Sequence, residues 1–131
     1  MKILISDDEL YNRLVLEKIL SPYGVCDQTI NGLEAVDAFH IALFDGTPYD
    51  LICLDMMMPE LDGLGVLRQI RLLEQEVGIK AEERAKVFIV SAMDPEELEE
   101  MNFIPDDYTD YLAKPIDQKH VFNKLKGHGL I

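Results

Sequence analysis

The stretch that decides the fold is Leu51-Ile52-Cys53-Leu54-Asp55-Met56-Met57-Met58-Pro59-Glu60-Leu61-Asp62-Gly63. It opens with a short apolar run, which ends in the carboxylate of Asp55 and is followed by a proline and an Asp-Gly turn. An apolar run this short, without alternation, is typical of a central strand buried on both faces of a parallel sheet. Asp55 therefore falls at the C-terminal end of that strand, where open α/β sheets form their sites.

Strand and helix patterns alternate on both sides of this stretch. The strands that we expect are 2–6, 25–30, 49–54, 86–91 and 110–113. Apolar residues at helical spacing predict helices over 10–23, 32–44, 64–77, 95–101 and 117–126. The segment 78–85 is either a charged loop or an extension of the helix before it. Alternating units of this kind predict a doubly wound, five-stranded parallel sheet with helices on both faces, an α/β three-layer sandwich.

Composition limits the classes of protein to which the chain can belong. Its 131 residues suffice for one domain with a substantial core, and we expect a single domain over 1–131. The net charge of −13 argues against a nucleic-acid or anionic-membrane partner, because both require clustered Lys and Arg. The start of the chain turns acidic before a signal peptide could develop, and no apolar run is long enough to cross a bilayer. We therefore expect a cytoplasmic protein.

Polar residues collect where the predicted strands end. Asp7 and Asp8 follow the first strand, Asp55 ends the third, Ser91 ends the fourth and Lys114 follows the fifth. In a doubly wound sheet these ends share one edge, so the five side chains are expected to meet in one crevice.

Each of these residues also has an ordinary structural explanation. Asp7 and Asp8 could cap the first helix, Ser91 could cap a later one, and Lys114 could be a surface lysine. As a set, however, they offer a cation site, a nucleophile, a hydroxyl and an ammonium, which together suit a phosphoryl group.

The chemistry of the set follows from its charges. Three crowded carboxylates, Asp7, Asp8 and Asp55, repel one another, and a bound Mg²⁺ relieves that repulsion because it prefers carboxylate oxygen. An ionised Asp55 can then attack phosphorus in line, while Lys114 and Ser91 bind phosphoryl oxygens. The product is an acyl phosphate on Asp55.

In this order the motifs resemble the receiver domains of two-component response regulators, over essentially the whole chain. The residues that carry the resemblance are Ile5-Ser6-Asp7-Asp8-Glu9, Asp55 to Gly63, Ser91-Ala92 and Lys114-Pro115. The resemblance implies a flavodoxin-like (βα)5 fold. It also implies that Asp55 accepts phosphate from a phosphohistidine on a sensor histidine kinase or a phosphotransfer protein.

Roles for the remaining site residues come from the same resemblance. It implies that Asp8 binds Mg²⁺ directly, that Asp7 does so through water, and that Met57 supplies its backbone carbonyl. Ser91 and Tyr111 match the family's switch residues. The Lys114–Pro115 peptide bond is expected to be cis, which is accessible at modest cost only before proline.

The function that we predict is a stand-alone receiver that catalyses its own phosphorylation and slow dephosphorylation and switches contacts with a downstream protein. It would be a monomer or a phosphorylation-dependent dimer. A Mg²⁺-dependent phosphatase with an aspartyl nucleophile is the alternative, although Met57 stands where many such enzymes place a second acid. A flavodoxin-like nucleotide binder is a weaker alternative, because Asp7, Asp8 and Glu9 would repel phosphate. Met57 and Met93 are expected to flank the phosphorylated Asp55 and to slow its hydrolysis.

Overall fold

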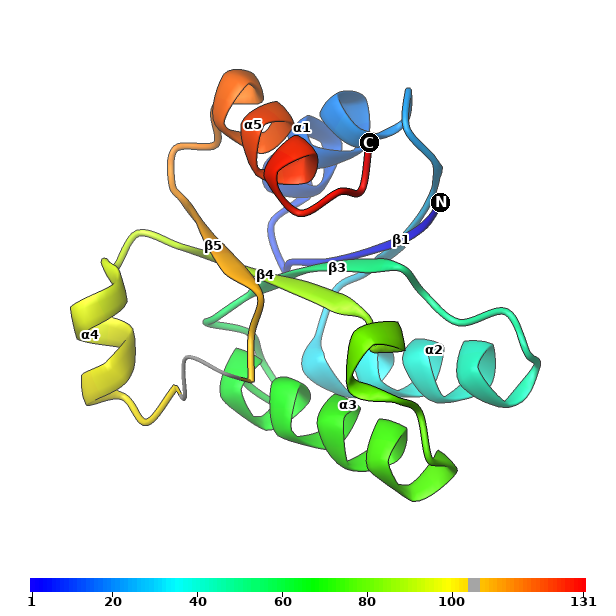
Figure 1. Cartoon of the computed structure of the whole chain (residues 1–131). Coiled ribbons are helices and arrows are strands. Elements are labelled where there is room, and N and C mark those ends of the chain that lie inside the picture. Colours follow the sequence, from blue (N-terminus) through cyan, green and yellow to red (C-terminus); the bar gives the residue numbers. More distant parts are fainter. Residues whose placement is uncertain (104–106) are drawn as a thin grey trace.

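Five parallel strands form one sheet in the computed structural model, which describes residues 1–103 and 107–131 (Figure 1). The strands are β1 (Lys2–Ser6), β2 (Val25–Thr29), β3 (Leu51–Asp55), β4 (Lys86–Ser91) and β5 (Asp110–Ala113). Their order across the sheet is β2-β1-β3-β4-β5, and each neighbouring pair is parallel. The order reverses direction after β1, as in a doubly wound sheet, and the fold class predicted from the sequence is confirmed.

Helices cover both faces of the sheet. They are α1 (Leu10–Leu20), α2 (Gly32–Phe44), α3 (Gly63–Val77), α4 (Pro95–Glu100) and α5 (Gln118–Gly127). In Figure 1, α1 and α5 lie on one face, α2 and α3 lie on the other, and α4 lies beside the β4–β5 end of the sheet. Among the described residues, no helix is both long enough and apolar enough to cross a membrane.

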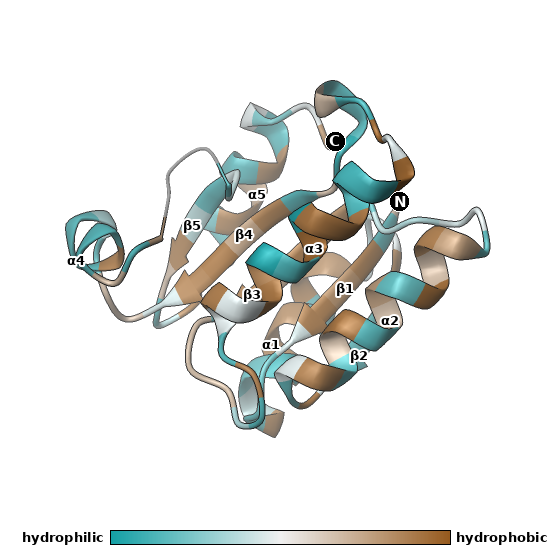
Figure 2. Cartoon of the chain, turned by 90° about the horizontal axis from the view of Figure 1, so that it is seen from below, coloured by the Kyte–Doolittle hydropathy of each residue, from teal (hydrophilic) through white to brown (hydrophobic). Residues whose placement is uncertain are grey.

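The strand β3 is buried along its whole length and contributes side chains to two separate hydrophobic cores. Ile52 and Leu54 pack into the core under α2 and α3, whereas Leu51 and Cys53 pack into the core under α1 and α5. Successive side chains of a strand point to opposite faces, so a central strand needs apolar residues at every position. The central strands are accordingly mostly brown in the hydropathy colouring of Figure 2.

The first helix ends at Leu20, three residues before the end that its apolar stripe predicts. Pro22 lacks a backbone N–H and cannot continue the helix. Gly24 then permits a close approach, since a Cβ there would lie 2.2 Å from the Met1 carbonyl oxygen. This approach lets the Val25 N–H donate to the Met1 oxygen at 3.0 Å as the chain enters β2.

The segment 78–85 is mainly a loop and does not extend α3. Gly78 adopts a left-handed conformation with φ of 81°, which ends the helix. A single 3-10 turn, η1 (Ala81–Glu83), precedes β4.

The Asp-Gly turn folds the loop after β3 back onto the end of that strand. Asp62 caps α3 by accepting a hydrogen bond from the Gly65 N–H at 2.9 Å. Gly63 donates its N–H to the Met56 carbonyl at 2.8 Å, and a Cβ at position 63 would lie 2.7 Å from the Asp55 carbonyl oxygen. The close contact explains why glycine follows Asp62, and it fixes the backbone around Asp55.

Candidate functional site

Three carboxylates lie together at the carboxyl edge of the sheet. Asp7 and Asp8 directly follow β1, and Asp55 is the last residue of β3. One carboxylate oxygen from each lies within 4.8 Å of the others. Asp7 and Asp55 are buried, with 1% and 4% of their surface exposed, whereas Asp8 is exposed to solvent. The structure thus brings together the acidic residues that the sequence places at separate strand ends.

Lys114 reaches this cluster from the end of β5. Its Nζ lies 3.0 Å from Oδ1 of Asp55 and 3.8 Å from Oδ2 of Asp7. The backbone N–H of Lys114 donates to the Ser91 carbonyl at 2.8 Å, which ties the ends of β4 and β5 together. The peptide bond between Lys114 and Pro115 is cis, as predicted. Lys114 is therefore an internal partner of the acidic cluster.

Burial and charge act together on Asp55. Burial is the largest influence and, with the neighbouring carboxylates of Asp7 and Asp8, raises the pKa of Asp55 to about 6, against the opposing effect of Lys114. Burial lowers the pKa of Lys114, but its hydrogen bond and charge interaction with Asp55 outweigh that effect and raise it. Lys114 and Asp55 therefore stabilise each other's charged forms, while the remaining carboxylates leave the site with excess negative charge.

Asp7 is fixed by its backbone and by one of its two carboxylate oxygens. Its N–H donates to the Thr29 carbonyl at 3.2 Å, and its carbonyl accepts from Nη1 of Arg13 at 3.0 Å. Oδ1 accepts from the Glu9 N–H at 2.9 Å, so the side chain does not cap α1, whose N-cap is Glu9. Nothing in the sequence pattern identifies Arg13, whose guanidinium donates to this backbone carbonyl and, through Nε, to Oε1 of Gln28 at 3.2 Å.

The second oxygen of Asp7, Oδ2, is buried and has no hydrogen-bond partner among the described residues. A buried carboxylate oxygen that accepts no hydrogen bond is costly, and the Lys114 ammonium, 3.8 Å away, offsets only part of that cost. With two further carboxylates beside it, this oxygen fits a hard divalent cation such as Mg²⁺, which takes carboxylate ligands.

Ser91 ends β4 and is buried beside the cluster. Its hydroxyl oxygen accepts a hydrogen bond from the Met93 N–H at 2.9 Å. It does not cap α4, because that role belongs to Asp94, whose carboxylate accepts from the Glu97 N–H.

The remaining predicted residues, Tyr111, Met57 and Met93, differ in how far they are buried. Tyr111 in β5 is half-buried, and the Lys124 ammonium lies 5.1 Å from the centre of its ring. Met57 is 64% exposed, whereas Met93 is half-buried against the core beneath α2 and α3. The two methionines thus differ in their access to solvent.

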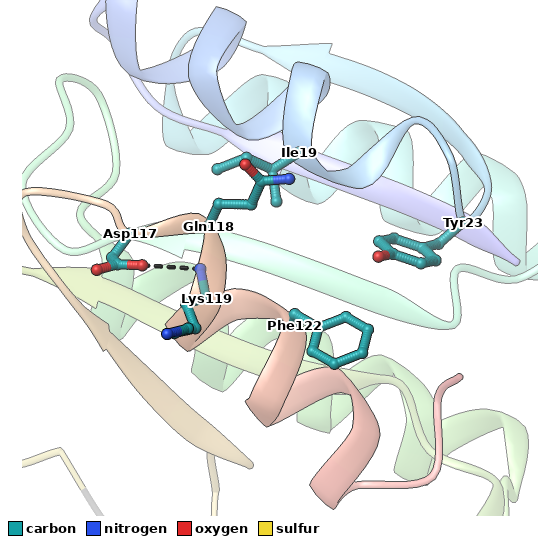
Figure 3. Close-up of a pocket in the computed structure, with 6 residues that line it drawn as sticks. All are labelled: Ile19, Tyr23, Asp117, Gln118, Lys119 and Phe122. Carbon is teal, nitrogen blue, oxygen red and sulfur yellow. Dashed lines mark hydrogen bonds between the residues drawn. The ribbon is translucent and has the colours of Figure 1, made fainter.

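A cavity of about 580 Å³ lies between α1 and α5, apart from the acidic cluster (Figure 3). Ile19, Tyr23 and Phe122 provide its apolar lining. The carboxylate of Asp117 also lines it but is engaged by the Lys119 N–H at 2.7 Å. None of the described residues that line this cavity belongs to the carboxylate cluster.

Fold and site together define a flavodoxin-like α/β protein with an acidic cluster and a lysine at the carboxyl edge of its sheet. Residues 3–126 match the family model of the response regulator receiver domain. The chain belongs to this family. It is therefore a receiver domain of two-component signalling, and the phosphatase alternative is not favoured.

Relatives from bacterial chemotaxis match nearly the whole chain. The chemotaxis protein CheY of Listeria monocytogenes is 31% identical over 128 residues, which cover 96% of this chain and 96% of that protein. CheY of Treponema pallidum is 29% identical over 126 residues, covering 95% of this chain and 79% of the relative.

A solved structure shows the same fold with ligands. The receiver domain of the histidine kinase CKI1 from Arabidopsis thaliana, crystallised with Mg²⁺ and BeF₃⁻, superposes with a TM-score of 0.76 at 27% identity. The match covers 96% of this chain and 89% of that one.

Proposed function

We propose that Asp55 accepts a phosphoryl group from a phosphohistidine on a sensor histidine kinase or a phosphotransfer protein. The observation that carries this proposal is the contact of Lys114 with Asp55 inside a buried carboxylate cluster. An ordinary surface lysine would not reach a carboxylate that is 4% exposed.

Asp55, Lys114 and Ser91 have separate roles in the proposed phosphoryl transfer. A carboxylate oxygen of Asp55 attacks phosphorus in line, the bond from phosphorus to the donor imidazole nitrogen breaks, and an acyl phosphate remains on Asp55. Lys114 neutralises charge on the transferred group, and the hydroxyl of Ser91 donates to one of its oxygens. The same residues release phosphate when water attacks, so the chain catalyses its own phosphorylation and dephosphorylation.

Asp8, Asp55 and the backbone carbonyl of Met57 would hold Mg²⁺ directly, and Asp7 would hold it through water. When bound, Mg²⁺ supplies positive charge to the phosphoryl oxygens and offsets repulsion among the carboxylates. The unpartnered Oδ2 of Asp7 supports this assignment.

The helix α1 begins two residues after Asp8, so its first turns lie close to the carboxylate cluster in the chain. Three apolar side chains there are largely exposed: Leu10 at 59%, Tyr11 at 75% and Leu14 at 51%. Their position next to Asp7 and Asp8 supports a docking surface for the donor on this part of α1. Phosphorylation would then switch contacts with a downstream protein in the cytoplasm, with Ser91 and Tyr111 relaying the change.

The test is phosphorylation by acetyl phosphate with Mg²⁺, followed by intact-mass spectrometry. We expect one hydroxylamine-labile phosphoryl group on the wild type and on Asp37→Asn, a variant of an exposed carboxylate in α2. We expect none on Asp55→Asn. Equal labelling of Asp55→Asn would overturn the proposal.

A further inference from the structure

A second concentration of charge, of opposite sign, lies at the far edge of the sheet. A cavity of about 210 Å³ opens where β4 and β5 begin, whereas Asp55 lies where β3 ends. Arg71, Arg84 and Lys86 line it. These are three of the 12 Lys and Arg residues in a chain of net charge −13, and Asp107 lines the cavity with them.

Arg71 holds the walls of this basic cavity together through hydrogen bonds. Its Nε donates to the Asp107 carbonyl at 2.7 Å, and its Nη1 donates to the Ala85 carbonyl at 2.9 Å and to Glu74 at 2.7 Å. Glu74 is 2% exposed and also accepts from the Ala85 N–H at 2.8 Å. The charge of Arg71 is therefore balanced by Glu74, and the pair fixes the walls of the cavity.

Arg84 and Lys86 supply charge that this pair does not neutralise. Among the residues that the structure describes, neither forms a salt bridge. Nε of Arg84 is buried and has no hydrogen-bond partner within the described ranges. A buried guanidinium N–H without an acceptor costs stability, and the unpaired charge of Arg84 favours an anion near it.

Other groups around the cavity define what it can hold. The Thr109 hydroxyl accepts from the Val87 N–H at 2.9 Å, and a hydroxyl that accepts one bond can still donate its own proton. Asp107 also lines the cavity, and its backbone carbonyl accepts from Nε of Arg71. Arginine geometry suits tetrahedral and planar oxyanions, which accept from two donors at once.

We propose that the basic cavity binds a small phosphate-type oxyanion, either free phosphate or the phosphate end of a small phosphomonoester. Arg84 and Lys86 supply two positive charges, and Thr109 supplies a hydroxyl. The cavity shares no residue with the carboxylate cluster, so its occupancy does not depend on Asp55.

The experiment is an amide NMR titration of the whole chain with inorganic phosphate in EDTA, at ionic strength held constant with chloride. Shifts are expected to saturate at residues 84–86 and 107–109. Arg84→Gln and, separately, Lys86→Gln should each weaken binding about tenfold, the effect of losing one charge-assisted bond. Lys80→Gln removes the same charge from an exposed position that does not line the cavity, and should bind as the wild type does.

A parallel titration with glycerol 3-phosphate identifies the form of the ligand. Tighter binding than that of phosphate assigns the site to a phosphomonoester, and weaker binding assigns it to the free ion. Thermal melts check that each variant is folded. Shifts that fail to saturate at these residues, or equal affinities for Lys80→Gln and both cavity variants, would overturn the proposal.

Discussion

The ammonium of Lys114 lies 3.0 Å from Oδ1 of Asp55, a residue 59 positions earlier in the chain. The same nitrogen is 3.8 Å from Oδ2 of Asp7. One lysine thus faces two buried carboxylates, and its charge keeps the pKa of Asp55 from rising further than burial and repulsion already raise it.

Removal of the Lys114 charge should affect both titration and chemistry. In Lys114→Gln we expect the pKa of Asp55 to rise above its value of about 6 in the metal-free protein, because the favourable charge interaction is lost. Labelling by acetyl phosphate should slow about 100-fold, as when one transition-state donor is removed. Carboxyl NMR titration and timed mass spectrometry measure the two effects. Lys126→Gln, on the exposed side of α5, is the control and should change neither.

Neutralising Asp8 should stabilise the metal-free fold. In Asp8→Asn one of three crowded carboxylates loses its charge, and we expect the melting temperature in EDTA to rise by about 2–4 °C. We expect Mg²⁺ to raise the melting temperature of the wild type and to leave that of this variant unchanged. Melts with and without Mg²⁺ test both statements. A lower melting temperature in EDTA would show that Asp8 has a structural role.

Much of this site could be predicted from the sequence because strand ends are marked locally. The apolar run before Asp55 and the acidic pair after Ser6 identify two ends, and parallel strands bring such ends to one edge. Contacts that join distant, irregular segments left no such mark. The basic cavity around Arg84 is of this kind. The end of α1 was predicted wrongly, because its apolar stripe continues to Tyr23 past Pro22.

The lifetime of the phosphorylated state should depend on Met57 and Met93. Apolar side chains cannot orient or activate water, so we expect slow hydrolysis in the wild type and several-fold faster hydrolysis in Met57→Asn and Met93→Glu. Met57 is the cleaner test, because it is 64% exposed and its replacement leaves the core intact. Decay of phosphorylated protein, followed by mass spectrometry with Mg²⁺, gives the rates. Identical decay in all three proteins would refute the expectation.

Stability at low pH should depend on Asp110. Burial raises the pKa of its carboxyl, but hydrogen bonds from Lys124 at 2.6 Å and His128 at 2.8 Å, with one from the Tyr111 N–H, outweigh burial and lower it. A lowered pKa in the folded state means that the ionised carboxylate stabilises the fold above about pH 4, the ordinary value for Asp, and that this contribution is lost as the pH falls below it.

Asp110→Asn should therefore be less stable than the wild type at pH 6, by about 1 kcal/mol, and the difference should shrink between pH 4 and pH 2. Urea unfolding across this range measures the difference. Asp37→Asn, without such partners, should track the wild type at every pH. A gap between Asp110→Asn and the wild type that stays constant down to pH 2 would contradict the assignment.

The order of strands across the sheet has a consequence for how the protein acquires its chemistry. Asp7, Asp55, Ser91 and Lys114 come from β1, β3, β4 and β5 or the residues that follow them, which are adjacent in space but scattered through the chain. A fragment must run at least from residue 7 to residue 114 to contain the complete set, and a partly folded chain with β5 undocked lacks its lysine in the site. Competence to take up phosphate should thus emerge only once β1, β3, β4 and β5 have docked. Short pulses of acetyl phosphate during refolding would measure, at each time, the fraction of chains in which the sheet is complete.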